Sequence, residues 1–378
     1  MRRVHWAVGC ALVLASLLAL PSDVQAGDDG MFSHKDWELV CDNTRTCRAA
    51  GFQEEDDVHA VSILLTRAAG PATAVTVQLQ LGDGSDEDVA RVQALPDKIP
   101  LVLWLAGKPA GTVTVDKQRL VAELPTALVA ALLPALGGNG RIEWKSGKAT
   151  WVLSTAGATA VLLKMDETQG RLGTPGALVR RGKRDEASVL PPLPAPVVLA
   201  AAVPKTASGT VLTPAQADAM RATLRKSLGK GQDCEALTAI ADKDDPDAGT
   251  LTVWPLSSTQ QLVEVRCWLA PYNAGYGYWV VGGGKPPVQV TDSGSEYDGA
   301  GTITSFQKGR GIADCAWSDA WNWDGRAFVH TDSSGDGMCR MVTAGGAWSL
   351  PTLVTEVRQS AREGAGKAAK PVPARRTR

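Results

Sequence analysis

The sequence predicts an α+β protein made of two mainly antiparallel β domains, each packed with a few helices and tied by disulfide bonds. Three observations support this fold class. Short runs rich in branched and aromatic residues recur without a regular alternation with helices, which argues against a doubly wound sheet. A proline-rich stretch divides the chain near its middle, and six of the seven cysteines fall into two groups, one on each side of it.

Residues 1–26 predict a signal peptide. Arg2 and Arg3 precede an apolar stretch over residues 4–20, and Pro21 ends that stretch. We therefore expect cleavage after Ala26 and a mature protein in the periplasm. A retained membrane anchor is the alternative, but the stretch is shorter than the roughly 20 residues that a spanning helix needs.

The N-terminal domain, residues 27–181, is expected to be rich in strands and to contain two helices. The first helix opens at Pro125 and stops before Gly137, and the second runs over residues 158–169 and stops at Gly170. Proline in the first turn and glycine just past the last are typical of helix boundaries. The strands predicted from branched and aromatic residues are 62–67, 74–81, 101–105, 112–115, 142–145 and 151–154.

A linker over residues 182–206 is predicted from its five prolines, which favour an extended chain. The C-terminal domain, residues 207–357, should begin with a helix that Thr213 caps and Pro214 opens. A sheet should follow, with strands at 251–254, 262–269, 277–281, 287–291, 302–307 and 326–330. Residues 358–378 mix lysine and arginine with alanine, glycine and proline, which indicates a disordered basic tail.

Composition excludes several classes of partner. The formal net charge of −1 gives no general attraction to nucleic acid or to anionic lipid. After removal of the signal peptide, no apolar run is long enough to span a membrane. The glycine run before Lys285 lacks the spacing of a phosphate-binding loop. We therefore expect no cofactor, no nucleic-acid partner and no membrane span in the mature chain.

Cys41 and Cys47 are expected to form a disulfide, because the N-terminal domain has no other cysteine after cleavage. Their bond closes the short loop 42–46. Asp42 and Asn43 suit such a loop, since their short polar side chains hydrogen-bond their own backbone.

The other four cysteines allow three connectivities, and the sequence does not decide between them. Proximity favours Cys234 with Cys267 and Cys315 with Cys339. A zinc site is the rival interpretation of these cysteines. Paired C-x2-C motifs and neighbouring histidines are missing, and an oxidising compartment favours disulfides, so we expect no metal site.

Catalytic chemistry has few candidates in this chain. No G-x-S-x-G motif occurs, and no histidine stands in a recognisable catalytic motif. Carboxylates and tryptophans do alternate in the segment 314–324, as a sugar-cleaving site would require. The alternative is that these rings pack around the Cys315 bridge and that the acidic residues lie in turns.

Three segments resemble a bacterial family of periplasmic proteins catalogued as domain of unknown function 1176. The first runs from Phe32 to Cys47, the second is Met165–Arg171, and the third combines Gly309–Gly311, 314–315, 323–325 and 339–340. The first half is also similar, more weakly, to invasion-associated locus B proteins, which are secreted envelope proteins of Gram-negative bacteria. The resemblance implies a periplasmic home and supplies no catalytic residues.

Together these features favour a non-catalytic module that binds an unknown protein or glycan of the cell envelope, or that has a purely structural role there. Arg310, Trp321 and Trp323 are the predicted binding residues, and no catalytic residue is predicted. The alternative function is a cell-wall glycan hydrolase that uses Asp314 or Asp324.

Overall fold

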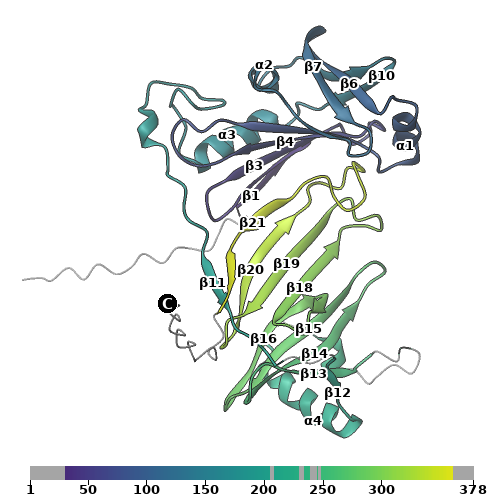
Figure 1. Cartoon of the computed structure of the whole chain (residues 1–378), viewed down its shortest axis with the longest axis vertical. Helices are drawn as coiled ribbons and strands as arrows, with labels where there is room; N and C mark the ends of the chain where they lie inside the picture. The colour runs from purple at the N-terminus through teal and green to yellow at the C-terminus, as the bar shows by residue number, and fades with distance from the viewer. Residues whose placement is uncertain (1–29, 205–207, 230–233, 239–244, 246–247, 361–378) are drawn as a thin grey trace, which may run out of the picture.

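The computed structural model describes residues 30–204, 208–229, 234–238, 245 and 248–360 (Figure 1). The predicted signal peptide and residues 361–378 of the predicted tail lie outside this range. Antiparallel strands dominate the fold and a few helices pack on them, which confirms the predicted β-rich character. Figure 1 shows an elongated molecule with the N-terminal region, residues 30–181, at one end and helix α4 at the other.

Two antiparallel sheets form the N-terminal region. The first has the order β1 (Met31–His34), β2 (Trp37–Cys41), β3 (Cys47–Phe52), β4 (Val61–Arg67), β5 (Thr76–Leu81) and β8 (Val121–Glu123). The second has the order β10 (Ala149–Leu153), β9 (Ile142–Ser146), β6 (Lys98–Leu105) and β7 (Lys108–Asp116). One hydrophobic cluster joins both sheets, and Trp37, Trp144 and Trp151 are fully buried in it.

Three helices accompany these sheets: α1 (Asp86–Gln93), α2 (Thr126–Leu136) and α3 (Ala158–Thr168). The last two confirm the predicted pair; α3 packs on β1–β3 and α2 on β5–β7. Gly157 precedes α3 with a φ of 100°, and a β-carbon there would lie 1.9 Å from the His34 carbonyl oxygen, so only glycine fits. Helix α1 was not predicted. Half of its residues are charged, and only Asp88 and Val92 are buried.

The family-like segment Met165–Arg171 makes a set of buried polar contacts. The Arg171 side chain is fully buried, and its Nη2 donates to the carbonyl oxygens of Ala68 and Gly70 at 3.1 and 2.7 Å. Its Nε donates to Gln169 Oε1 at 2.8 Å. Asp166 Oδ2 accepts hydrogen bonds from two backbone amides, at 2.7 and 2.9 Å. The Arg171 contacts fasten the loop after α3 to the loop that follows β4, and Asp166 fastens α3 to residues 178–179.

The C-terminal region contains two five-stranded antiparallel sheets. The first has the order β12 (Thr210–Val211), β13 (Leu251–Pro255), β14 (Gln260–Leu269), β15 (Ala274–Gly282) and β16 (Lys285–Gly294). The second has the order β17 (Glu296–Tyr297), β18 (Thr302–Lys308), β19 (Ala316–Trp323), β20 (Phe328–Gly335) and β21 (Leu350–Leu353). Strand β19 was not predicted, because its sequence AWSDAWNW was interpreted as turns around packed rings.

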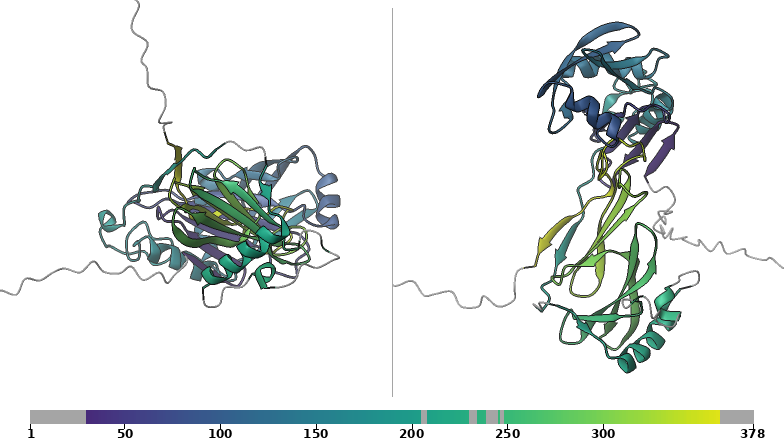
Figure 2. Two further views of the ribbon diagram at one scale, coloured as in Figure 1. Left: turned by 90° about the horizontal axis from the view of Figure 1, so that it is seen from below. Right: turned by 90° about the vertical axis from the view of Figure 1, so that its right-hand side faces the viewer.

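Helix α4 (Pro214–Leu224) and the short α5 (Glu235–Thr238) cover one face of the first of these sheets. Thr213 caps α4 as predicted, in a capping box with Gln216. The right-hand view of Figure 2 shows α4 on the outer side, away from the second sheet. A separate hydrophobic cluster joins the two sheets and includes Tyr278, Ile303 and Trp323.

A third core joins the N-terminal and C-terminal regions. It contains Val40, Phe52 and Leu64 from the six-stranded sheet, together with Val342 and Trp348 from the segment before β21. The Trp348 indole Nε1 donates to Ser62 Oγ at 2.7 Å. The six-stranded sheet is therefore apolar on both faces, which explains why β2–β4 read as nearly continuous buried runs.

The proline-rich segment is attached to the rest of the molecule along its length. The backbone of Leu190 makes hydrogen bonds with the backbones of Gly70 and Gln169. Further along, strand β11 (Val197–Ala200) pairs in parallel with β22 (Glu356–Gln359). The first residues of the predicted basic tail thus form a strand. Because the third core also crosses between the regions, the division into two domains at 182–206 stays a prediction.

The described residues hold three disulfides, all with the favoured pairing. The bonds are Cys41–Cys47, Cys234–Cys267 and Cys315–Cys339. The first joins directly paired positions of β2 and β3 across the predicted loop. Asp42 Oδ1 accepts from the Thr44 amide at 2.8 Å in that loop, as the turn prediction required.

Candidate functional site

One face of the strand pair β19–β20 carries most of the exposed aromatic and titratable groups of the predicted segment 314–324. Register pairs Trp317 with Gly335, Asp319 with Ser333 and Trp321 with His330. Directly paired residues of antiparallel strands point to the same side. Trp317, Asp319 and Trp321 therefore share a face with Ser333 and His330.

Burial along this face increases from one end to the other. Trp323 is only 1% exposed, because it lies where the two C-terminal sheets pack together. Trp321 is half-buried at the edge of that core, and Trp317 is 40% exposed. The sheet face is therefore core at one end and an open aromatic surface at the other.

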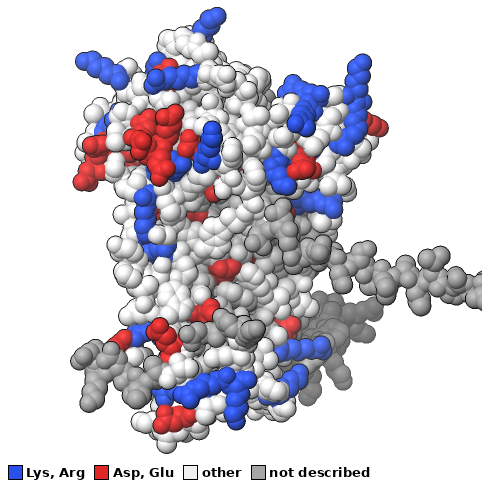
Figure 3. All heavy atoms as spheres, turned by 180° about the vertical axis from the view of Figure 1, so that it is seen from behind, with Lys and Arg blue, Asp and Glu red and all other residues white. Residues whose placement is uncertain are grey.

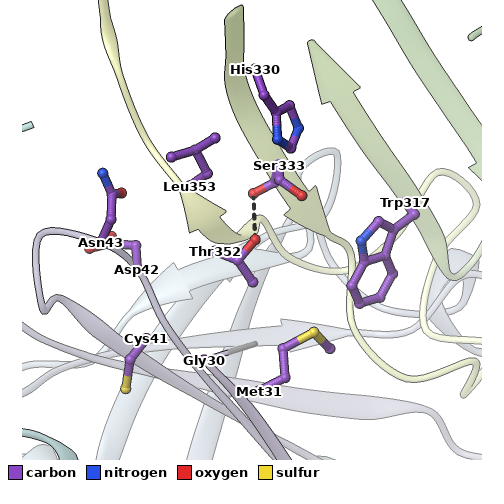
Figure 4. Close-up of a pocket in the computed structure, with 10 residues that line it drawn as sticks. All are labelled: Gly30, Met31, Cys41, Asp42, Asn43, Trp317, His330, Ser333, Thr352 and Leu353. Carbon is purple, nitrogen blue, oxygen red and sulfur yellow. Dashed lines mark hydrogen bonds between the residues drawn. The ribbon is translucent and has the colours of Figure 1, made fainter. Parts of the chain in front are cut away.

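A cavity of about 540 Å³ lies beside the open end (Figure 4). Trp317, His330 and Ser333 line it from β19 and β20, and Thr352 and Leu353 line it from β21. The opposite wall comes from the N-terminal region, through residues 30–31 and 41–43. Figure 4 shows these side chains grouped around the space between β20 and the β1–β2 hairpin.

The asparagine and aspartate in this wall hold the structure together. Asn43 makes two hydrogen bonds with the backbone of Val354, at 2.8 and 3.0 Å. Asp42 Oδ2 accepts from Arg48 Nη1 at 2.8 Å, and its Oδ1 accepts from the loop. They shape the cavity and tie its two walls together, and their polar atoms are already engaged.

His330 and Asp319 form the polar centre of the open face. His330 Nε2 lies 2.9 Å from Asp319 Oδ1, and the imidazole stacks on the Trp321 ring with a centroid distance of 5.0 Å. Burial acts to raise the pKa of Asp319, but hydrogen bonds from His330 and Ser333 and the His330 charge outweigh it and hold the pKa below its ordinary value. The Asp319 carboxylate can therefore accept hydrogen bonds, and it lies on the same face as the rings of Trp317 and Trp321.

The other carboxylates of the predicted hydrolase segment are bound in structural contacts. Asp314 is buried and accepts from Arg310 Nε at 2.6 Å and from the Met341 amide at 2.7 Å. Asp324 accepts from two amides of the β19–β20 turn, at 2.7 and 2.8 Å.

The three predicted binding residues lie in different places. Trp321 borders the open face, and Trp323 lies in the core. Arg310 lines a second cavity of about 340 Å³, which residues of both regions surround. Trp317 and His330 were not among the predicted binding residues. The alternation of Trp317, Asp319 and Trp321 at every second position, which is the period of a strand with one open face, could have indicated Trp317. His330 lies on the neighbouring strand, and its position beside Trp321 follows only from the pairing of β19 with β20.

Arg310 belongs to a polar contact between the two regions. Its partner Asp314 holds the Met341 amide, and neighbouring Arg340 reaches Asp36 of the N-terminal region, with Nη2 2.8 Å from Asp36 Oδ1. Gln53 Nε2 donates to the Arg340 carbonyl oxygen at 2.7 Å. Residues of the first and third family-like segments therefore meet here.

In the described residues, no helix is long and apolar enough to cross a membrane.

Comparison with known proteins identifies a family but no activity. The model of the family described as "Protein of unknown function (DUF1176)" matches residues 31–355. The uncharacterized protein YpfG of Escherichia coli (strain K12) is 24% identical over 356 residues, which cover 88% of this chain and 95% of that protein. No solved structure matches the chain. The resemblance to invasion-associated locus B proteins stays a prediction. The family match covers most of the chain, and the chain therefore belongs to the DUF1176 family of proteins of unknown function.

Proposed function

We propose that this protein is exported to the periplasm of a Gram-negative envelope and binds a glycan there without cleaving it. Three disulfides support an oxidising compartment. The leader-like sequence 1–26 supports export by a signal peptide. The observation that carries the binding proposal is the open aromatic face of β19–β20 beside the 540 Å³ cavity.

The chemistry of that face fits a hydroxyl-rich ligand. The exposed ring of Trp317 offers a flat apolar surface for the carbon-bound hydrogens of a sugar ring. The hydroxyl groups of a sugar need donors and acceptors at the ring edge, and the Asp319–His330 pair supplies both. A volume of about 540 Å³ lies within the range of about 300 to 1,000 Å³ that is usual for ligand pockets.

Replacing Trp317 with alanine tests this proposal. We expect Trp317→Ala to weaken binding of soluble peptidoglycan fragments by about tenfold or more, because a central aromatic anchor often contributes over 1 kcal/mol. Phe306→Ala is the matched control. Phe306 is 41% exposed, and it pairs with Ser318, so it points to the opposite face of the same sheet.

Binding would be measured by isothermal titration calorimetry on the mature chain, with thermal unfolding of each variant as a check on folding. Equal binding by both variants would contradict the proposed surface. The absence of any glycan binding by the parent protein would favour a purely structural role in the envelope.

The hydrolase alternative requires two carboxylates on either side of one bond. Asp319 lies on the same sheet face as Trp317, whereas Asp332 pairs with Ala320 and so points to the opposite face. Asp314 and Asp324 are engaged as described above. This arrangement favours binding over cleavage, and release of glycan fragments by the parent protein but not by Asp319→Asn would overturn that preference.

A further inference from the structure

Exposed apolar side chains are concentrated in the proline-rich segment that connects the two regions. Four large ones lie within the ten residues 190–199, with exposed fractions between 38% and 57%. These four side chains form what we call the apolar ridge: Leu190, Leu193, Val197 and Leu199. Figure 1 shows this part of the chain running down one side of the molecule, from the N-terminal region to β11 and away from α1.

A basic loop, residues 180–184, directly precedes the ridge. It exposes four cations, none of which forms an ion pair within the described part of the chain: Arg180, Arg181, Lys183 and Arg184. Asp185 and Glu186 follow the loop. Glu186 is paired with the buried Arg171, whose Nη1 lies 3.4 Å from Glu186 Oε1, so the surface of the loop stays strongly positive.

The basic loop is folded against the turn after α3, and this turn brings it to the ridge. The Gly173 amide donates to the Arg180 carbonyl oxygen at 2.8 Å. The Arg184 guanidinium donates to the carbonyl oxygen of Gly170. A β-carbon at Gly170 would lie 3.1 Å from Leu190 Cγ. Arg184 and the first residue of the ridge therefore meet at the same glycine, and the loop and the ridge adjoin.

The family-like segment Met165–Arg171 supports both parts of this surface. Asp166 Oδ2 accepts from the amides of residues 178–179, which lead into the basic loop. The Gln169 carbonyl oxygen accepts from the Leu190 amide at 3.2 Å. The buried polar contacts of this segment thus fix the positions from which the cations and the leucines are exposed.

The far end of the ridge lies beside the last described residues of the chain. Leu199 pairs with Arg358, and the Ser360 amide donates to the Ala200 carbonyl oxygen at 2.8 Å. The sequence 361–378, rich in lysine and arginine, follows directly. Figure 3 shows the largest group of acidic side chains near α1, at the opposite edge of the N-terminal region. Basic sequence therefore flanks the ridge at both ends, although the net charge of the chain is −1.

We propose that this side of the molecule docks on the surface of a bilayer that contains anionic lipid. The basic loop lies at the lipid phosphates, because cations near an anionic leaflet are attracted to it. The apolar ridge enters the headgroup region, where its side chains leave water. A soluble polyanion would satisfy the cations but would leave the leucines exposed. No residue of the loop or the ridge lines the cavity of the proposed glycan site, so the two proposals are independent.

Co-sedimentation of the mature chain with vesicles of phosphatidylglycerol and phosphatidylethanolamine tests this proposal, with phosphatidylcholine vesicles as the neutral reference. We expect binding to the anionic vesicles that weakens as salt is added. The double variant Arg180→Gln with Lys183→Gln should weaken this binding by about thirtyfold, or about fivefold for each cation. The matched control is Lys108→Gln with Lys148→Gln, which removes two exposed cations near the β6–β7 and β9–β10 turns.

The basic sequence 361–378 is present in every variant, so a difference between the two double variants reports on the loop itself. The absence of vesicle binding, equal binding to anionic and neutral vesicles, or equal binding by the two double variants would each overturn the proposal.

A leucine variant distinguishes a lipid surface from other anions. Leu193→Ser should weaken binding to the anionic vesicles by about tenfold and leave binding of dextran sulfate unchanged, since only lipid buries this side chain. Leu269→Ser is the matched control, because Leu269 is 63% exposed and lies on β14 of the C-terminal region. Vesicle binding that Leu193→Ser leaves unchanged would overturn the proposal and indicate a soluble polyanion as the partner.

Discussion

Glu38 shows how a single side chain at the contact between the regions responds to pH. It follows Trp37 on β2 and points to the face that the segment 336–350 covers, where its Oε1 is buried without a hydrogen-bond partner among the described residues. Burial raises its pKa from 4.5 to about 7, and a hydrogen bond from the Met338 backbone offsets a smaller part.

This shift predicts a loss of stability as the pH rises. The unfolded state releases the Glu38 proton near its ordinary pKa of 4.5, whereas the folded state keeps it until about pH 7. The folded state therefore binds more protons between these values, and the free energy of unfolding falls with rising pH, by about 3 kcal/mol in total. Glu38→Gln should remove this part of the dependence and be the more stable protein at pH 8.

Urea unfolding of both proteins at pH 5 and pH 8 measures the effect. Other buried carboxyls, such as Asp336 with a pKa of about 6, contribute to the slope of both proteins equally. The difference between the two slopes is therefore the diagnostic quantity, and parallel slopes would show that Glu38 is ionised in the folded state.

At the scale of single elements, the sequence predicted those whose pattern is strong. Helices α2 and α3 were predicted from apolar spacing and from their proline and glycine ends. Helix α1 was missed because it buries little apolar surface and is stabilised by its Ser85 cap and acidic first turn. Strand β19 was missed because its polar and aromatic residues serve two environments, core at Trp323 and open surface at Trp317.

The pairing of β2 with β3 carries a prediction at this scale. Gly51 of β3 lies opposite Trp37, and a β-carbon there would be 2.3 Å from the Trp37 ring. That ring cannot easily move, because it is fully buried and its Nε1 donates to the Ser154 carbonyl oxygen at 2.8 Å. Gly51→Ala should therefore destabilise the protein by about 1–3 kcal/mol through overpacking.

Gly138→Ala is the control for that experiment. Gly138 is exposed after α2, and the nearest atom to a β-carbon there is 3.5 Å away, an ordinary contact. Chemical unfolding should place Gly138→Ala within about 0.5 kcal/mol of the parent protein, as is usual for surface substitutions. A Gly51→Ala variant of equal stability would mean that the β2–β3 ladder shifts freely to admit the methyl group.

At the scale of the whole molecule, the decisive contacts join residues that are far apart in the sequence. Trp348 and Ser62 are separated by 286 residues and Arg340 and Asp36 by 304. Composition and local periodicity contain no information about such pairs. The sequence therefore predicted the two β-rich halves. It named Arg310 as a binding residue but could not show the contacts that Arg310 and its neighbours make. The two cavities could not be predicted for the same reason, since each is walled by both ends of the chain.

The core shared by both regions predicts cooperative unfolding of the whole described structure. Trp348 is 8% exposed and packs against the six-stranded sheet, so melting either region exposes surface that the other had buried. Scanning calorimetry of the parent protein should show one transition.

Trp348→Ala should lower the free energy of unfolding by about 3–5 kcal/mol, because it deletes a packed side chain. It should also divide the unfolding into two transitions, because the sheets on either side keep their own cores. Trp317→Ala deletes the same side chain from an exposed position and should leave a single transition. Two transitions in the parent protein would show instead that the regions unfold independently, and the predicted division into two domains would then describe the energetics better than the shared core does.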